Sequence, residues 1–233
     1  NPSLLGEVAR VIADEARAKH HAYAAEGDHG HYKGLTFWSP NINIFRDQRW
    51  GRGQETYGEC PFLTARLGVS FVRGLQGDDA RYLKLVATAK HFAVHSGPEG
   101  LRHGFDARVS PKDLFETYLP AFAALVREGG VESVMTAYNR VNGEPASASP
   151  TLLSQMLRKD WGFSGYVVSD CWAIRDIHEQ HQVTPGPIES AAAAVNAGCD
   201  LNCGCTYEHL PAALEQGLLT EADLDRSLPR LFA

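Results

Sequence analysis

Apolar residues along the chain follow two alternating patterns, a helical spacing of three to four residues and short continuous runs. The helical spacing predicts helices over residues 1–24, 62–75, 110–129, 149–161 and 188–197, with two more towards the end of the chain. The continuous runs predict strands over residues 35–44, 85–94, 131–141, 166–169 and 199–203. On the first helix, one apolar side is formed by Leu4, Leu5, Val8, Val11, Ile12 and Ala16.

Local signals mark where several of these helices begin and end. Ser110-Pro111 and Ser149-Pro150 each predict a helix start, with serine as the cap and proline in the first turn. Gly129-Gly130 and Gly198 predict helix ends, because glycine readily adopts the left-handed conformation that closes a helix.

Strands separated by helices predict an α/β protein with a parallel sheet, and the continuous apolar runs suit strands covered on both faces. A complete (β/α)8 barrel takes about 250 residues, whereas this chain has 233 residues and begins with a helix. We therefore expect a (β/α)8 TIM-barrel-like fold over residues 1–233, as a single domain that lacks its first strand and is a fragment of a longer multidomain protein. An open doubly wound sheet is the alternative, but the glycine-rich phosphate loop of that fold is absent from the sequence.

The composition of the chain disfavours two classes of binding partner, nucleic acid and membrane. Apolar residues make up 44% and charged residues 21% of the chain, which is ordinary for a globular protein. A net charge of −6 with both signs scattered disfavours binding to nucleic acid or to an anionic membrane surface. Apolar runs of membrane-spanning length are also absent. We expect neither nucleic acid nor membrane as a partner.

The chain has five cysteines, three of which, Cys199, Cys203 and Cys205, lie close together near His209. Their C-x3-C-x-C spacing is not one that assigns a metal site, and small buried thiols are the favoured interpretation. A disulfide among these three cysteines remains open, as does a metal or redox function built on them. We expect no metal and no cofactor.

Polar residues recur where the predicted strands end, which in a (β/α) barrel is the face that holds the active site. Each has an ordinary structural explanation when taken alone: Asp170 as a helix cap, Lys90 as a side chain that extends its ammonium group to solvent, Arg52 as a surface cation, and His91 as a buried histidine with satisfied hydrogen bonds. Their repetition at the same end of successive strands favours a site.

The residue types in this ring suit a sugar. Cations and amides bond hydroxyl groups, indole rings cover the apolar face of a sugar, and a carboxylate beneath the anomeric carbon acts as a nucleophile. The sequence contains neither the G-x-S-x-G elbow of a serine hydrolase nor the H-E-x-x-H motif of a zinc helix. A glycosidase is therefore the chemistry that the ring favours.

Five stretches carry these residues: WSPNINIFRDQRWGRGQETYGE (38–59), AKHFAVHSGPE (89–99), SVMTAYNRVNGEPA (133–146), GFSGYVVSDCWAI (162–174) and AGCDLNCG (197–204). In this order they resemble glycoside hydrolase family 3, the β-glucosidases and β-xylosidases, and the HSGPE and SDC forms look most like the β-xylosidase branch. The likeness runs from Asn1 to Ala233.

The resemblance implies a barrel catalytic domain of a retaining exo-acting β-glycosidase, periplasmic or secreted, that acts on oligosaccharides or aryl β-glycosides. Asp170 falls on the family's nucleophile, and nearby cations are expected to keep it ionised with a lowered pKa. Glu99 is the in-chain candidate for the general acid, which in the family usually comes from a C-terminal domain. The implied substrate-binding residues are Arg52, Lys90, His91, Arg102, Tyr138 and Trp172. The alternative is a catalytically incomplete sugar-binding barrel fragment that lacks the general acid.

Overall fold

The computed structural model describes residues 1–232. Its helices are α1 (Pro2–Ala25), α2 (Pro61–Gln76), α3 (Pro111–Asp113), α4 (Pro120–Arg127), α5 (Ala173–Glu179), α6 (Pro187–Ala197), α7 (Leu210–Glu215) and α8 (Glu221–Phe232). Its strands are β1 (Thr36–Phe37), β2 (Val86–Phe92), β3 (Asp106–Ala107), β4 (Ser133–Thr136), β5 (Arg140–Val141), β6 (Glu144–Pro145) and β7 (Tyr166–Val168). Shorter or unlabelled helical segments cover Gly53–Glu55, Glu99–Leu101, Leu114–Tyr118, Ala146–Ala148, Pro150–Asp160 and Thr206–His209.

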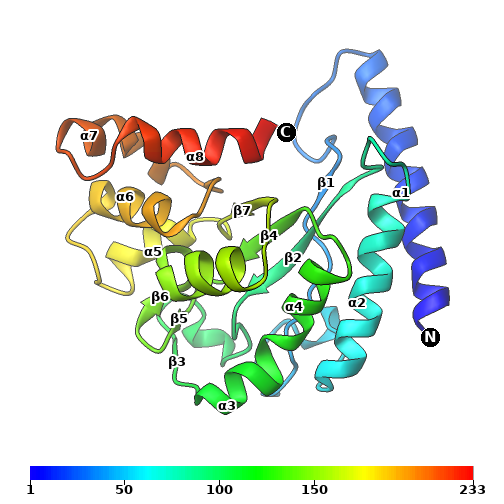
Figure 1. Cartoon of the computed structure of the whole chain (residues 1–233), viewed down its shortest axis with the longest axis horizontal. Helices are drawn as coiled ribbons and strands as arrows, with labels where there is room; N and C mark the ends of the chain where they lie inside the picture. Colours follow the sequence, from blue (N-terminus) through cyan, green and yellow to red (C-terminus); the bar gives the residue numbers. More distant parts are fainter. Residues whose placement is uncertain (233) are drawn as a thin grey trace.

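The main sheet has the order β1-β2-β4-β7, and each neighbouring pair is parallel. Helices connect these strands, which confirms the predicted α/β architecture and gives an arc of a (β/α)8 TIM-barrel-like fold (Figure 1). A small second sheet, β3-β5-β6, lies beyond the end of β4. Because all four main strands are parallel, their carboxyl ends lie along one edge of the sheet.

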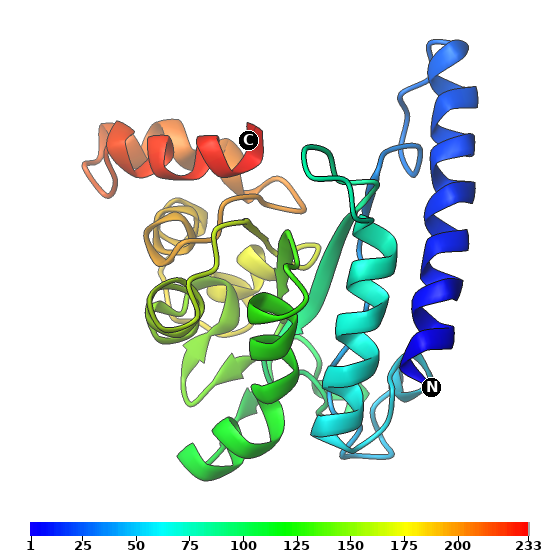
Figure 2. The ribbon, with the colours of Figure 1, turned by 45° about the vertical axis from the view of Figure 1, so that its right-hand side comes forward.

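Helix α1 packs along α2 at one side of the molecule, and α6, α7 and α8 lie at the other (Figure 2). The contact between α1 and α2 is close, since a Cβ atom on Gly74 would lie 2.5 Å from the carbonyl oxygen of Gly6. The buried face of α1 accordingly consists of small residues, namely Gly6, Ala9, Ala13 and Ala16. The predicted apolar side is wrong for Leu4, Val8 and Val11, which are exposed.

Two serine caps form as predicted. Ser110 Oγ accepts from the backbone N–H of Asp113 at 3.1 Å, and Ser149 Oγ accepts from that of Leu152 at 2.9 Å. The helix predicted from residue 110 to 129 is interrupted before Pro120, where α4 begins, because proline lacks an N–H for the helical ladder.

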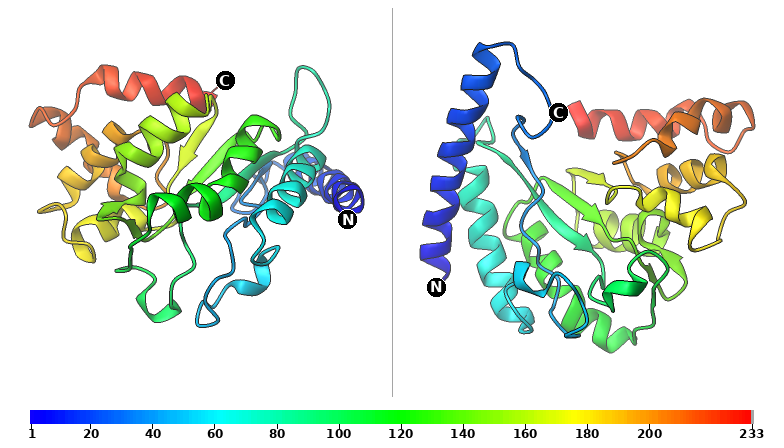
Figure 3. Two further views of the ribbon diagram at one scale, coloured as in Figure 1. Left: turned by 60° about the horizontal axis from the view of Figure 1, so that its bottom comes forward. Right: turned by 180° about the vertical axis from the view of Figure 1, so that it is seen from behind.

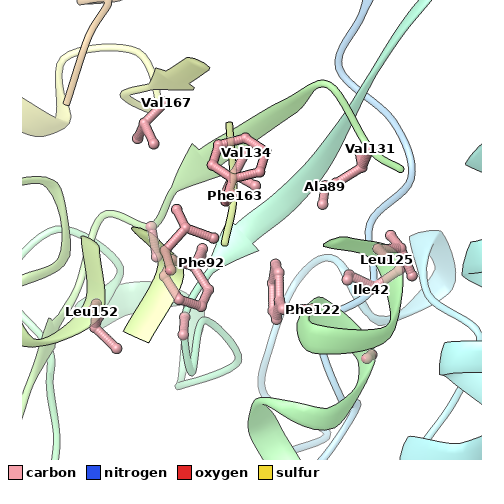
Figure 4. Packing of buried hydrophobic residues seen from close by; sticks show 14 of the residues in the cluster. Ile42, Ala89, Phe92, Phe122, Leu125, Val131, Val134, Leu152, Phe163 and Val167 are labelled. Carbon is pink, nitrogen blue, oxygen red and sulfur yellow. The ribbon is translucent and has the colours of Figure 1, made fainter. Parts of the chain in front are cut away.

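The hydrophobic core lies between the sheet and the helices that cover it (Figure 4). Phe92 of β2 packs on Phe122 of α4 with ring centroids 5.0 Å apart, and Val134 of β4 is fully buried beside them. This packing fixes β2 and β4, the strands whose ends carry several of the predicted site residues.

Beyond β7, the predicted strand over residues 199–203 is reduced to a single parallel bridge between Leu201 and Val168. Within this segment the side chain of Asp200 is fully buried, and Arg158 and Arg230 donate hydrogen bonds to it at 2.7 Å and 2.8 Å. This ionic network ties α8 to the segment that precedes β7.

The disulfide left open among the clustered cysteines forms with a different partner. Cys203 bonds to Cys171, the residue after Asp170, while Cys60, Cys199 and Cys205 are free. The sequence places Cys171 far from the cluster, but the parallel arrangement of β7 and Leu201 brings the two segments side by side.

None of the helices within residues 1–232 combines the length and the apolar character that crossing a membrane requires.

Candidate active site

The predicted site residues come from the carboxyl ends of the main strands and from the loops that follow. Lys90 and His91 lie on β2, Tyr138 follows β4 and Asp170 follows β7. Arg52 lies in the loop after β1, which projects from the same side of the molecule as the loop after β2 (Figure 3). Backbone hydrogen bonds from Ile42 to Lys90 and from Lys90 to Pro40 extend the β1–β2 pairing to this edge.

Arg52 is held in place by two partners. Its guanidinium donates to both carboxylate oxygens of Glu55, at 2.6 Å and 2.7 Å, and its Nη1 lies 2.9 Å from Nε2 of His91. Hydrogen bonding to Arg52 holds the pKa of Glu55 below its usual range. Arg52 is thus a preorganised cation whose orientation is fixed from two sides.

The protonation of His91 follows from its partners. Arginine can only donate, so Nε2 of His91 accepts, and the ring proton must sit on Nδ1, which donates to Asn43 Oδ1 at 2.9 Å. Burial, with the nearby His95 and Arg52, lowers the pKa of His91 well below its ordinary value. His91 is therefore neutral, and its approach to Asp170 Oδ2 at 3.6 Å is not an ion pair.

Lys90 lies near Arg52, Glu55 and Asp170. Burial and the positive charge of Arg52 lower its pKa, while Glu55 and Asp170 oppose the shift. No hydrogen bond to its ammonium group is present within residues 1–232, so its donors remain available.

Asp170 is buried at the centre of the cluster, with 8% of its surface exposed. Its Oδ1 accepts from the backbone N–H of Cys171 at 2.8 Å, whereas Oδ2 is buried without a hydrogen-bond partner within the described residues. Burial raises the pKa of Asp170, although Cys171 N–H, Arg52, Tyr138 and Lys90 each lower it. The expected lowering is therefore wrong, because desolvation outweighs the cations.

Tyr138 lies on another side of the Asp170 carboxylate. Its hydroxyl approaches the Asp170 carboxylate closely enough to influence its pKa, and burial together with that carboxylate raises the pKa of the phenol. The guanidinium of Arg102 lies over the Tyr138 ring, 5.9 Å from its centroid.

The Glu99 carboxylate interacts with groups of the surrounding loops. Its carboxylate pairs with Arg102 and accepts from the backbone N–H of Gly51 at 3.1 Å. Both oxygens therefore serve to hold loop groups in place, which suits a supporting role better than that of a proton donor.

Trp172 follows the nucleophile candidate by two residues and stands at the start of α5. Its backbone has a left-handed φ of 70°, and its N–H donates to the carbonyl of Cys203 at 2.7 Å. The indole is 42% exposed and packs on Arg175. Asp170 does not cap α5 with its side chain, so the helix-cap explanation for this residue does not hold.

The structure thus brings Asp170 together with Arg52, Lys90, His91 and Tyr138, with Arg102 behind Tyr138. Sequence reasoning missed Glu55, and also Asp176, whose Oδ2 lies 2.7 Å from Nδ1 of His103. Glu55 follows Arg52 by three residues, a spacing at which side chains meet on one helical turn, and that was its available signal. Within residues 1–232, groups of three or more His, Cys, Asp or Glu side chains arranged to hold a metal are absent.

Comparisons with known proteins agree on one family. The family model described as "Glycosyl hydrolase family 3 N terminal domain" matches residues 28–233. The chain is 48% identical to a xylan 1,4-β-xylosidase of Xylanibacter ruminicola and 43% identical to a probable β-D-xylosidase 7 of Arabidopsis thaliana, covering 100% and 97% of this chain. It spans 28% and 30% of the length of these two relatives.

Solved structures give the same result. A GH3 exo-β-xylosidase in complex with a xylobiose aziridine activity-based probe matches 100% of this chain and 30% of its own, with a TM-score of 0.91 and 35% identity. A β-glucosidase from Listeria innocua, as a D270A mutant in complex with laminaribiose, matches 98% of this chain and 32% of its own, with a TM-score of 0.80 and 33% identity.

Proposed function

The chain belongs to glycosyl hydrolase family 3, and on that premise we propose that it forms the sugar-binding and nucleophile-bearing part of a retaining, exo-acting β-glycosidase. The enzyme releases a terminal sugar from β-linked oligosaccharides through a covalent glycosyl intermediate. The observation that carries the proposal is the buried Asp170 carboxylate, whose Oδ2 has no hydrogen-bond partner within the described residues and which is flanked by cations at the strand ends.

Asp170 acts as the nucleophile. Its carboxylate is anchored through Oδ1 to the Cys171 N–H, which leaves Oδ2 free to form the bond to the anomeric carbon. Burial makes the carboxylate more basic than a solvated one, and a more basic oxygen is the better nucleophile. Arg52 and Lys90 oppose this shift and so favour the ionised form.

The glycone is held by donors around Asp170. Arg52 and Lys90 donate to sugar hydroxyls, and Trp172 covers the apolar face of the ring at the rim. His91 keeps Arg52 oriented through Nε2. Arg102 supports the side of the pocket formed by Tyr138.

The preferred sugar is xylose. The relatives reported above are named as β-xylosidases, and the solved structure with the higher TM-score carries a xylobiose-based probe. A β-glucosidase also matches, at a lower TM-score, so glucose is the competing sugar.

Retention of configuration requires a second carboxyl group about 5–5.5 Å from the nucleophile, which first protonates the leaving oxygen and then activates water. Glu99 is occupied by Arg102 and Gly51. We place the general acid in the part of the enzyme that corresponds to the remaining length of the relatives, of which this chain spans 28% in the first case.

The test is mechanism-based labelling with a 2-deoxy-2-fluoro-β-xyloside that carries a 2,4-dinitrophenolate leaving group. Oδ2 of Asp170 forms the bond to C1 while the bond from C1 to the aryl oxygen breaks, and dinitrophenolate leaves with the electron pair. Mass spectrometry should find the fluoroxylosyl group on the peptide that contains Asp170, and Asp170→Asn should remain unlabelled. Labelling of another residue, or none in the unmodified chain, would overturn the assignment.

A second function is favoured by the environment of Asp170. Within the described residues, the groups with the largest influence on its pKa are cations, a phenol and an N–H, and a second carboxylate is not among them. A chain that is labelled by the reagent but does not turn over an aryl β-xyloside would therefore act as a sugar-binding part that depends on an acid from elsewhere. The same preparation should be compared with the fluoroglucosyl reagent to identify the sugar.

A further inference from the structure

Helix α5 buries a carboxylate that the proposed chemistry does not use. Asp176 is 2% exposed, and its Oδ2 lies 2.7 Å from Nδ1 of His103. Burial raises the pKa of Asp176, while His103 and Arg175 lower it. A carboxylate at this depth needs a strong partner, and within residues 1–232 His103 supplies its side-chain hydrogen bond. The bond also determines that Nδ1 of His103 carries a proton and fixes the orientation of the ring.

The imidazole of His103 then packs on Tyr138. The two ring centroids are 4.5 Å apart, with an interplanar angle of 61°, so the edge of one ring meets the face of the other. Although half of the His103 side chain is exposed, the ring is therefore constrained on both sides, by Asp176 and by the Tyr138 ring.

His181, which follows α5, also packs against the loop that carries His103 and the strand end that carries Tyr138. His181 is buried, and the backbone carbonyls of His103 and Tyr138 face its ring without reaching hydrogen-bond geometry. The loop that carries His103 and the strand end that carries Tyr138 are thus both packed against α5 and the residues after it.

We propose that His103, oriented by Asp176, is a positioning residue that holds the Tyr138 hydroxyl against the Asp170 carboxylate. A hydrogen bond joins Asp176 to His103 and a ring contact joins His103 to Tyr138, while Tyr138 and Asp170 each influence the pKa of the other. His103 does not contact the sugar in this account and acts through the phenol. The inference rests on the proposed function, because it assigns a role in the attack by Asp170.

The experiment measures the rate constant for labelling of the full chain by the dinitrophenyl fluoroxyloside. Departure of dinitrophenolate needs no proton, so this rate reports the attack by Asp170 without a general acid. His103→Ala should lower the saturating rate about tenfold, which is less than the ~100-fold cost of a 1 Å misplacement. The reagent concentration at half-saturation should stay unchanged, because no sugar contact is lost. Asp176→Asn should change the rate in the same direction and by less.

A double-mutant cycle separates positioning from a general structural effect. In a Tyr138→Phe background the hydroxyl is already absent, so His103→Ala should cause no further loss of rate. The matched control is Glu179→Gln, which removes an exposed acid from the same helix and should leave the rate unchanged.

The outcomes are distinct. Equal rates for the unmodified chain and His103→Ala would refute the positioning role while leaving Asp170 as the nucleophile. A change in half-saturation would show that His103 contacts the sugar and would refute the positioning role. An undiminished effect of His103→Ala in the Tyr138→Phe background would show that His103 does not act through the phenol and would refute it as well. Absence of labelling in the unmodified chain would instead overturn the proposed function, and with it this inference.

Discussion

Replacing the nucleophile candidate by its neutral isostere, Asp170→Asn, should stabilise the protein while removing its reactivity. Burial raises the pKa of Asp170 despite Arg52 and Lys90, which means that the folded protein disfavours the charge more than the cations favour it. Asparagine has the same shape and can still accept from the Cys171 N–H through Oδ1. The substitution therefore removes an unfavourable charge and keeps the favourable contact.

The size of the effect follows from the unpaired oxygen. A buried acceptor without a partner costs about 1–3 kcal/mol, and more when it is charged; Oδ2 of Asp170 is such a charged atom within residues 1–232, and the amide nitrogen that replaces it is neutral. Because attraction to Arg52 and Lys90 is lost in the same step, we expect the lower part of this range, about 1–2 kcal/mol of added unfolding free energy at pH 7. At about 2–4 °C per kcal/mol for a chain of this size, Tm should rise by about 2–8 °C.

The pH dependence identifies the cause. A carboxyl group with a raised folded pKa binds its proton more tightly in the folded state, so stability falls as pH rises from the ordinary value of 3.8 through the folded pKa. The advantage of Asp170→Asn should be full at pH 7 and should disappear towards pH 4, as urea unfolding at both pH values would show. Asp223→Asn is the control, because hydrogen bonds lower the pKa of Asp223 and its replacement should destabilise at pH 7. A variant less stable than the unmodified chain at pH 7, or an advantage independent of pH, would refute the reasoning.

Three further substitutions test the frame around the site. Asp200→Asn leaves two partly buried arginines facing a neutral group at a fully buried position and should lower the unfolding free energy by about 3–5 kcal/mol in urea titrations. Cys171→Ser removes a disulfide that spans 32 residues and should cost about 3–4 kcal/mol without reductant, with a much smaller difference under reducing conditions. Gly165→Ala would place a Cβ atom 1.9 Å from the carbonyl oxygen of Glu132 and should cost about 1–3 kcal/mol or more, whereas Gly100→Ala, which meets nothing within 4 Å, should leave Tm unchanged.

Much of the fold was predictable because local chemistry and tertiary packing agree. The serine caps at Ser110 and Ser149 and the parallel apolar strands follow directly from their sequence signals. The face of α1 was not predictable in the same way. The close contact at Gly6 and Gly74 selects small residues for the interface, and the larger apolar residues then turn outward. Hydrophobic spacing identifies a helix, but the distance to its neighbour decides which face is buried.

The site was predictable to the level of strand ends, because parallel strands bring their carboxyl ends to one edge. The sequence could not show whether burial or the nearby cations would decide the pKa of Asp170. Counting cations near Asp170 predicts a lowered pKa, whereas its depth in the cluster raises it. The disulfide partner of Cys203 and the His103–Asp176 pair depend on contacts between segments separated by 32 and 73 positions. No local spacing encodes such contacts.

The charged groups around Asp170 differ in whether they have partners in the free protein, and this difference links substrate binding to the stability of the fold. Arg52 and Arg102 each pair with a carboxylate from their own loop, Glu55 and Glu99, so their forks are oriented in advance. Within the described residues, Asp170 Oδ2 lacks such a partner, and only burial and nearby charges, not a hydrogen bond, shift the pKa of Lys90. A sugar hydroxyl both donates and accepts, so one that bridges these two groups satisfies both at once. The free energy lost by burying Oδ2 in the free protein is then recovered when the substrate binds, and Asp170→Asn, which removes that loss, should also weaken binding of a xyloside.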